Sequence, residues 1–304
     1  MADKTAQRVP LSGIHLPPAP TSVLPIADVD PTPTQVALGI DAAWTAGQPS
    51  GVALAVLEAE RWRLRAAAPS YDHFLNQAAG VACDAPPRGS SPDAPALLAA
   101  AEALAGARVD LVAIDMPLAR TPIVARRASD NAITRAFGGR YCGTHSPSAM
   151  RPGPLSDGLR AGFEDAGYPL RTDAAQTGGL IEVYPHPALV VLAQAPRRLP
   201  YKASKTRTYW PDESLAARRV LLAAEWARIV GLLATRIDGV EAALPPLPDD
   251  ASGVARKAHE DMIDAIVCAW VGITALGGQA DAYGDAESAI WVPREGGTAG
   301  PLAG

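Results

Sequence analysis

The chain has 304 residues, of which 48% are hydrophobic and 19% are charged, so it can fold around a large core. The formal net charge is -5 and the sequence pI is about 5.6, which excludes a global basic field, so any phosphate-binding surface must be local. Three widely spaced cysteines, Cys83, Cys142 and Cys268, argue against a structural zinc site and fit a reducing compartment.

Two features of the sequence predict the compartment in which the protein lies. The sequence contains no apolar run near the roughly 20 residues that span a bilayer, and the first residues lack the apolar core of a signal peptide. We therefore expect a soluble, cytoplasmic protein with no membrane contact. Residues 1–34 are proline-rich with little periodicity, which predicts a flexible arm before one domain over residues 35–304.

The first half of this domain alternates strands and a helix. VALGID (36–41), SGVALAVLE (50–58) and RWRLRAAA (61–68) predict three strands of an antiparallel meander. APALLAAAEALAG (94–106) predicts a helix, because it has proline near its start and glycine at its end. The nearly continuous apolar run VDLVAIDMPL (109–118) is typical of a buried parallel strand that follows a crossover helix.

The second half begins with a polar, glycine-rich stretch. Helices are expected over 156–166 and 213–234, and the apolar helix HEDMIDAIVCAWVGITAL over 259–276. GGLIEVYPHPALVVLA (178–193) begins as a strand that turns at Pro185. After Gly277 we expect glycine-rich coil with AIWVP as a late strand.

Acidic residues lie beside the predicted buried elements. Asp41 and Asp115 each end a strand, Glu182 lies within a strand, and Asp261 and Asp264 begin the last helix on a shared face. Ligands collect at the carboxyl ends of parallel strands. Clustered carboxylates repel one another unless cations lie between them, and Mg²⁺ or Mn²⁺ prefers such oxygen ligands. The pattern predicts a metal site formed by Asp41, Asp115, Asp261 and Asp264.

Each acid also has a simpler interpretation. Asp41 and Asp115 could close turns after their strands, and Asp261 could complement a helix amino terminus. Asp264 lies within an apolar run, so its charge should suffer both desolvation and repulsion in the metal-free protein. We therefore expect Asp264→Asn to be tolerated or stabilising without metal, and to abolish activity.

Five motifs resemble, in order, those of an uncharacterised family described as predicted nucleases of RNase H-like fold. They are GIDAAW, VAIDMPL, IEVYPHPAL, YKASKTRTYW and HEDMIDAIVCAW, and the resemblance covers about residues 38–293. EDMIDAIVCA is also similar to the final helix of RuvC-type Holliday-junction resolvases. The resemblance implies an α/β fold: an RNase H-like mixed sheet, with an antiparallel meander followed by parallel strands, flanked by helices and carrying inserted loops and helices.

The resemblance also implies site roles. RNase H-like enzymes carry catalytic acids at the ends of their first and fourth strands and on a late helix. Asp41, Asp115, Asp261 and Asp264 occupy those places, and we add Glu182 as a candidate catalytic acid from its own position.

A basic loop supplies the local positive charge that a polyanion needs. Lys202, Lys205 and Arg207 alternate with aromatic residues between Tyr201 and Trp210. They are predicted to bind substrate phosphate, and the alternative is a solvated loop with anchored aromatics.

Three functions are compatible with these patterns. The leading hypothesis is a divalent-metal-dependent nuclease that hydrolyses phosphodiester bonds in DNA or RNA with Mg²⁺ or Mn²⁺. The first alternative is a non-catalytic binding or scaffold protein with the same fold. The second is a kinase or ATPase of the actin-like superfamily, which is disfavoured because the sequence shows no second lobe with a glycine-rich phosphate loop.

Overall fold

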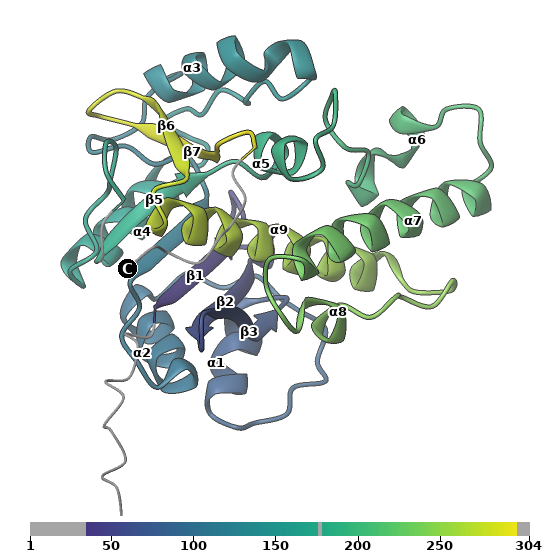
Figure 1. Cartoon of the computed structure of the whole chain (residues 1–304), viewed down its shortest axis with the longest axis horizontal. Coiled ribbons are helices and arrows are strands. Elements are labelled where there is room, and N and C mark those ends of the chain that lie inside the picture. The colour runs from purple at the N-terminus through teal and green to yellow at the C-terminus, as the bar shows by residue number, and fades with distance from the viewer. Residues whose placement is uncertain (1–34, 176–177, 297–304) are drawn as a thin grey trace, which may run out of the picture. The chain divides into compact units, whose positions relative to one another are not determined.

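The computed structural model describes residues 35–175 and 178–296, and in these ranges seven strands form one sheet (Figure 1). β1 (Val36–Asp41), β2 (Gly51–Glu58) and β3 (Arg61–Ala68) form the predicted antiparallel meander. Ala59 and Glu60 join β2 to β3 with φ values of 46° and 65°. Two residues with positive φ make a tight turn whose twist matches that of the strands it connects.

The second half of the sheet is mainly parallel. The strand order is β3-β2-β1-β4-β5-β7-β6. β4 (Leu111–Asp115) pairs with β1, β5 (Gly179–Val183) with β4, and β7 (Ala289–Pro293) with β5, all in parallel. β6 (Ala280–Gly284) runs antiparallel to β7. The predicted α/β mixed sheet, a meander followed by parallel strands, is confirmed, and its strand order is consistent with an RNase H-like fold.

Helices cover one face of the sheet near its meander end. α1 (Tyr71–Ala78), α2 (Ala94–Ala105) and α4 (Pro154–Asp165) pack there against the alternate apolar residues of β1, β2 and β4. α2 begins after Asp93, whose side chain accepts a hydrogen bond from the Ala96 amide, and ends at Gly106 with a φ of 69°. Such a cap and such a glycine satisfy the free backbone groups at the two ends of a helix.

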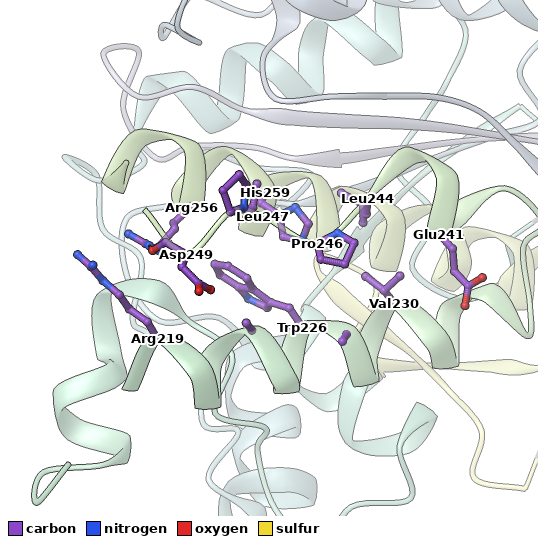
Figure 2. A pocket seen from close by; sticks show the side chains of 13 residues that line it. Arg219, Trp226, Val230, Glu241, Leu244, Pro246, Leu247, Asp249, Arg256 and His259 are labelled. Atoms are coloured by element: carbon purple, nitrogen blue, oxygen red, sulfur yellow. The ribbon is translucent and has the colours of Figure 1, made fainter. Parts of the chain in front are cut away.

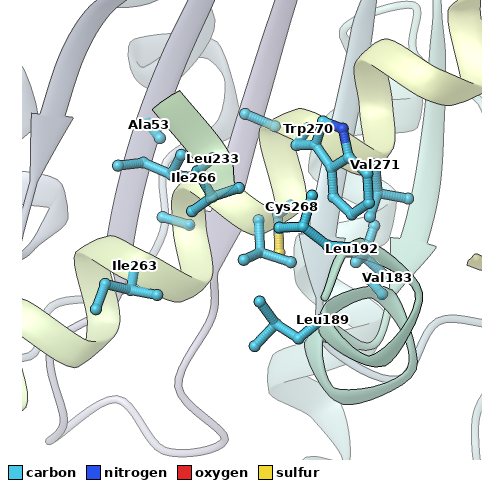
Figure 3. Packing of buried hydrophobic residues seen from close by; sticks show 14 of the residues in the cluster. Ala53, Val183, Leu189, Leu192, Leu233, Ile263, Ile266, Cys268, Trp270 and Val271 are labelled. Atoms are coloured by element: carbon cyan, nitrogen blue, oxygen red, sulfur yellow. The ribbon is translucent and has the colours of Figure 1, made fainter. Parts of the chain in front are cut away.

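The opposite face carries α5 (Pro185–Leu192), α7 (Leu215–Ala234) and α9 (Gly253–Leu276). α9 is buried almost throughout its carboxyl-terminal half. Figure 3 shows Ile266 and Cys268 of α9 in the same apolar cluster as Leu233 of α7 and Leu189 of α5. α9 is therefore the central helix of this layer.

Shorter elements complete the described chain. They are α3 (Ala128–Phe137), η1 (Gly138–Arg140), η2 (Ala203–Lys205), α6 (Thr206–Tyr209) and α8 (Val240–Ala243). The predicted coil after Gly277 is wrong over Ala280–Gly284, because β7 provides a partner for a sixth strand there. The predicted proline-rich arm, residues 1–34, lies outside the described residues, so its boundary stays a prediction. In the described part of the chain, no helix combines the length and apolarity of a membrane span.

Candidate active site

The carboxyl ends of β1 and β4 place Asp41 and Asp115 side by side. The two strands are parallel neighbours and the two aspartates are register partners, so their Cα atoms lie about 4.8 Å apart, one strand spacing. Ile40 and Ile114, the preceding residues, point into the core beside α2. Because side chains alternate along a strand, both carboxylates point toward the face that α9 covers.

Two glycines allow α9 to cross this edge at close range. A Cβ atom on Gly39 would lie 2.2 Å from the carbonyl oxygen of Ala265, and one on Gly51 would lie 2.2 Å from that of Asp261. Any larger residue would therefore push the helix off the sheet. Gly51 is also the register partner of Asp41, so this contact holds Asp261 beside the end of β1.

α9 begins earlier than the sequence analysis predicted. Its first residue is Gly253, and the Ser252 hydroxyl caps it by accepting a hydrogen bond from the Ala255 amide at 3.1 Å. Asp261 therefore lies in the third turn and not at the helix entrance. Because the helix dipole acts within the first turn, it does not explain this acid.

A cleft of about 620 Å³ opens at this edge of the sheet, and Asp41, Asp115 and Asp261 all line it. Lys257 and Arg151 bring positive charge to the same cleft. The other lining residues are Ala42, Ala43, Trp44, Gln48, Pro49, His145, Ser146 and Ser148. The cleft thus combines acids, two cations and two aromatic rings, and the Arg151 guanidinium lies 5.9 Å from the centroid of Trp44.

Asp264 is fully buried beside the cleft and does not line it. The Tyr201 hydroxyl donates to its Oδ1 at 2.7 Å, and the Lys202 ammonium pairs with its Oδ2. Lys202 also lies 3.4 Å from Glu260, which accepts a hydrogen bond from the Ala203 amide at 2.6 Å. Asp264, which has no evident partner in the sequence, is therefore neutralised by Lys202 of the basic loop.

Asp261 is neutralised on one side only. Lys257, four residues earlier on α9, forms an ion pair with Oδ1. Oδ2 is buried and has no hydrogen-bond partner among the described residues. Burial raises the pKa of Asp261 to about 6, and the nearby Lys257 limits that rise. One carboxylate oxygen of Asp261 thus keeps unused acceptor capacity.

The strand-end carboxylates lack cationic partners in the described ranges, since Lys202 and Lys257 pair with α9 acids instead. Burial, followed by repulsion from Asp264, raises the pKa of Asp115 to about 8. The same causes in the same order raise the pKa of Asp41 well above its ordinary value. Both groups would carry full charge at neutral pH only if a cation joined them.

The donor set fits a hard divalent cation. Mg²⁺ often takes one or two protein carboxylates and completes its octahedral shell with water and substrate phosphate. Asp41 and Asp115 can supply those carboxylates, with the free Oδ2 of Asp261 nearby. In the part of the chain described, no three His, Cys, Asp or Glu side chains are grouped closely enough to hold a metal ion. A bound ion would therefore depend on water or substrate for its remaining ligands.

Glu182 is not brought into this group. It pairs in register with Ile114, so its side chain points to the sheet face opposite the one that Asp115 faces. Its carboxylate accepts a hydrogen bond from Nη2 of Arg127 at 2.7 Å and another from the Leu118 amide at 2.8 Å. Arg127 also binds Asp130 at 2.9 Å. These contacts indicate a structural ion cluster and leave a catalytic role for Glu182 as a prediction.

The basic loop divides into two parts. Lys202 contacts the acids of α9, whereas the side chains of Lys205 and Arg207 are exposed on η2 and α6. Sequence reasoning missed Lys257, although its spacing of four residues from Asp261 on a helix was a usable signal. It also missed Arg127 as the partner of Glu182, which lies 55 residues away in the sequence.

A comparison with protein families gives a match that spans the residues of this site. No curated protein matches the chain, and no solved structure does. A family model described as "Protein of unknown function (DUF429)" matches residues 39–288, a range that contains both strand ends and the crossing of α9. Because this range is more than half of the chain, the protein belongs to the DUF429 family of unknown function.

Proposed function

We propose that the protein is a divalent-metal-dependent nuclease that hydrolyses phosphodiester bonds in nucleic acid. The observation that carries the proposal is the Asp41–Asp115 pair, which lies at adjacent parallel strand ends in an open cleft beside Asp261. The resemblance of the sequence motifs to RNase H-like nucleases and RuvC-type resolvases also supports this proposal.

The chain's own residues have distinct parts in this function. A bound Mg²⁺ or Mn²⁺ ion would supply a Lewis acid and an activated water. Asp41 and Asp115 would hold the ion, and Asp261 would add an oxygen from α9. Lys202 would keep its ion pair with Asp264 next to them.

Positive charge at the cleft makes approach by a polyanion feasible. Arg151 and Lys257 line the cleft beside the acids, so they are placed to contact phosphate groups next to the one that reacts. Lys205 and Arg207 are exposed and extend the proposed phosphate-binding surface. This assigns the local basic surface that an acidic protein needs to bind nucleic acid.

Metal titration tests the proposal directly. We expect isothermal titration calorimetry to show Mn²⁺ binding to the wild type that is lost in Asp41→Asn and Asp115→Asn. The matched control is Asp84→Asn, an exposed aspartate outside the cleft, which should bind as the wild type does. Cleavage of labelled single-stranded, duplex and four-way-junction substrates should follow the same pattern. Mn²⁺ binding that survives both site substitutions would contradict the proposal.

A non-catalytic nucleic-acid-binding protein is the second candidate. The observation in its favour is that Lys202 and Lys257 already neutralise Asp264 and Asp261 within the chain. This candidate predicts nucleic-acid binding in chelator, no cleavage with Mn²⁺, and no effect of Asp41→Asn or Asp115→Asn. An actin-like kinase has less support, because the described strands form one sheet and not two similar lobes.

A further inference from the structure

A second cavity, of about 250 Å³, lies between α7, α8 and the first half of α9 (Figure 2). It shares no lining residue with the active cleft. Its walls are mainly apolar and include Val230, Leu244, Pro246 and Leu247. Since an apolar cavity of about 150 Å³ holds a benzene ring, this one has room for a fused two-ring compound. We call it the Trp226 pocket.

Two aromatic rings form one wall of the Trp226 pocket, with their planes tilted by 46° to each other. The ring centroids of Trp226 and His259 are 5.0 Å apart, and both rings line the cavity. Trp226 is fixed because its Nε1 donates to the carbonyl oxygen of Tyr201 at 2.8 Å. A planar ring entering the cavity would therefore meet an aromatic face that is already ordered, which lowers the entropic cost of binding.

His259 adds a polar group to this surface. Its imidazole lines the cavity beside Trp226 and is only 4% exposed. An imidazole nitrogen in this position can exchange a hydrogen bond with a molecule in the cavity.

Charge is distributed unevenly along the Trp226 pocket. Arg219 and Arg256 lie at one end with Asp249, whereas Glu241 lies at the other end (Figure 2). Arg256 is held in place because its Nη2 donates to the carbonyl oxygen of Asp249 at 2.8 Å. Two guanidinium groups against one carboxylate leave that end with net positive charge. The planar fork of arginine is suited to binding a carboxylate.

We propose that the Trp226 pocket binds a small, flat, apolar anion. Its ring would pack against Trp226 and His259, and its carboxylate would lie between Arg219 and Arg256. The site is separate from the proposed nuclease cleft, so its occupancy does not depend on whether the protein cleaves nucleic acid.

A matched pair of probes tests the ligand class. Indole-3-acetate and indole-3-acetamide have nearly the same shape, but only the first is charged. Isothermal titration calorimetry on the full chain should show one indole-3-acetate bound, with the acetamide at least about tenfold weaker, because charge-assisted hydrogen bonds are the stronger ones. Arg219→Gln should weaken the acetate by a similar factor and leave the acetamide unchanged. Arg219 is exposed, so this variant should fold.

A second pair of variants tests the location. Ala227 and Ala224 are both exposed on α7, but only Ala227 lines the cavity. Ala227→Phe should abolish binding of indole-3-acetate, and Ala224→Phe should leave it unchanged. The proposal is overturned if the wild type does not bind the acetate, if both probes bind equally, or if Ala227→Phe binds as the wild type does. Asp41→Asn should bind the probe normally, which separates this test from that of the nuclease.

Discussion

Two sets of acids lie at neighbouring strand ends of this sheet, and the chain neutralises only one of them. Glu182 is bound by the Arg127 guanidinium and a backbone amide, and Arg127 also binds Asp130. Asp41 and Asp115 lie on the other face and have no cation of the described chain within ion-pair distance. The comparison shows that a strand-end position does not by itself define a metal site. The presence or absence of an internal cation separates the two sets.

The two sets should also contribute oppositely to stability. An assembled buried ion cluster holds its charges favourably, and removing one member leaves the others unpaired. Uncompensated acids raise the free energy of the folded metal-free protein, which is common where residues are placed for function. Substitutions in each set therefore test whether an internal cation distinguishes the two sets.

The largest effect is expected in the neutralised set. Arg127→Met leaves Glu182 and Asp130 buried without their cation, so it should lower the free energy of unfolding by about 3–5 kcal/mol. Urea denaturation measures this change. Arg135→Met on the same helix is the control, because Arg135 is exposed, and it should change the free energy by less than about 0.5 kcal/mol. Equal effects of the two substitutions would remove the basis of the comparison.

Asp264 belongs to the neutralised set, contrary to the expectation from its sequence context. Asp264→Asn deprives Lys202 of its closest carboxylate and leaves it with Glu260 at 3.4 Å. We therefore expect the metal-free protein to lose about 1–3 kcal/mol of stability, and not to gain any. The double substitution Lys202→Met with Asp264→Asn should recover part of this loss in urea denaturation. A stabilised single variant in chelator would show that the ion pair is not formed.

The stability effect now expected for Asp264→Asn is opposite to the one expected from the sequence. This difference illustrates what sequence reasoning can predict. The apolar runs that end at Asp41 and Asp115 were enough to predict that the two acids are neighbours if their strands are adjacent, because each strand leaves a local pattern. Lys202 lies 62 residues before Asp264, and Arg127 lies 55 residues before Glu182. Such pairings depend on the path of intervening loops, which hydrophobic periodicity does not encode.

The same distinction holds for the fold. The meander, the crossover helix α2 and the strand β4 were predicted because each has a continuous apolar pattern with clear ends. The start of α9 was missed because its first turns are polar, and β6 was missed because ADAYG has little apolar content. β6 owes its structure to its tertiary partner β7, whereas the start of α9 carried a local signal in the Ser252 cap that the sequence analysis did not use.

A smaller and opposite effect is expected in the uncompensated set. The unfolded Asp115 carboxyl ionises near its ordinary pKa of 3.8, whereas the folded one does so at about 8. The unfolded state therefore binds fewer protons between these values, and stability falls as pH rises through that window. Asp115→Asn removes this dependence, so in chelator it should be more stable than the wild type by on the order of 1 kcal/mol at pH 8.

Thermal unfolding at pH 4 and pH 8 measures this difference. Near pH 4 the folded wild type carries a neutral carboxyl, so the two proteins should melt at similar temperatures. Added Mn²⁺ should reverse the order at pH 8 by stabilising only the wild type. A variant that is less stable than the wild type at both pH values would assign Asp115 a structural hydrogen-bonding role.

The smallest effect on stability, and the sharpest distinction, comes from Lys257→Gln. Its side chain is 52% exposed, so losing the ion pair with Asp261 should change the free energy of unfolding by only a few tenths of a kcal/mol. The substitution removes a positive charge from the cleft and leaves both oxygens of Asp261 available to a cation. Mn²⁺ affinity should therefore rise several-fold at low salt, and the gain should shrink as salt screens the lysine. Lys205→Gln, outside the cleft, should leave the affinity unchanged.

If Lys257→Gln instead leaves Mn²⁺ binding unaltered at every salt concentration, the acids of α9 do not share a cation with the strand ends. Asp261 would then belong with Glu182 and Asp264 among the internally neutralised acids.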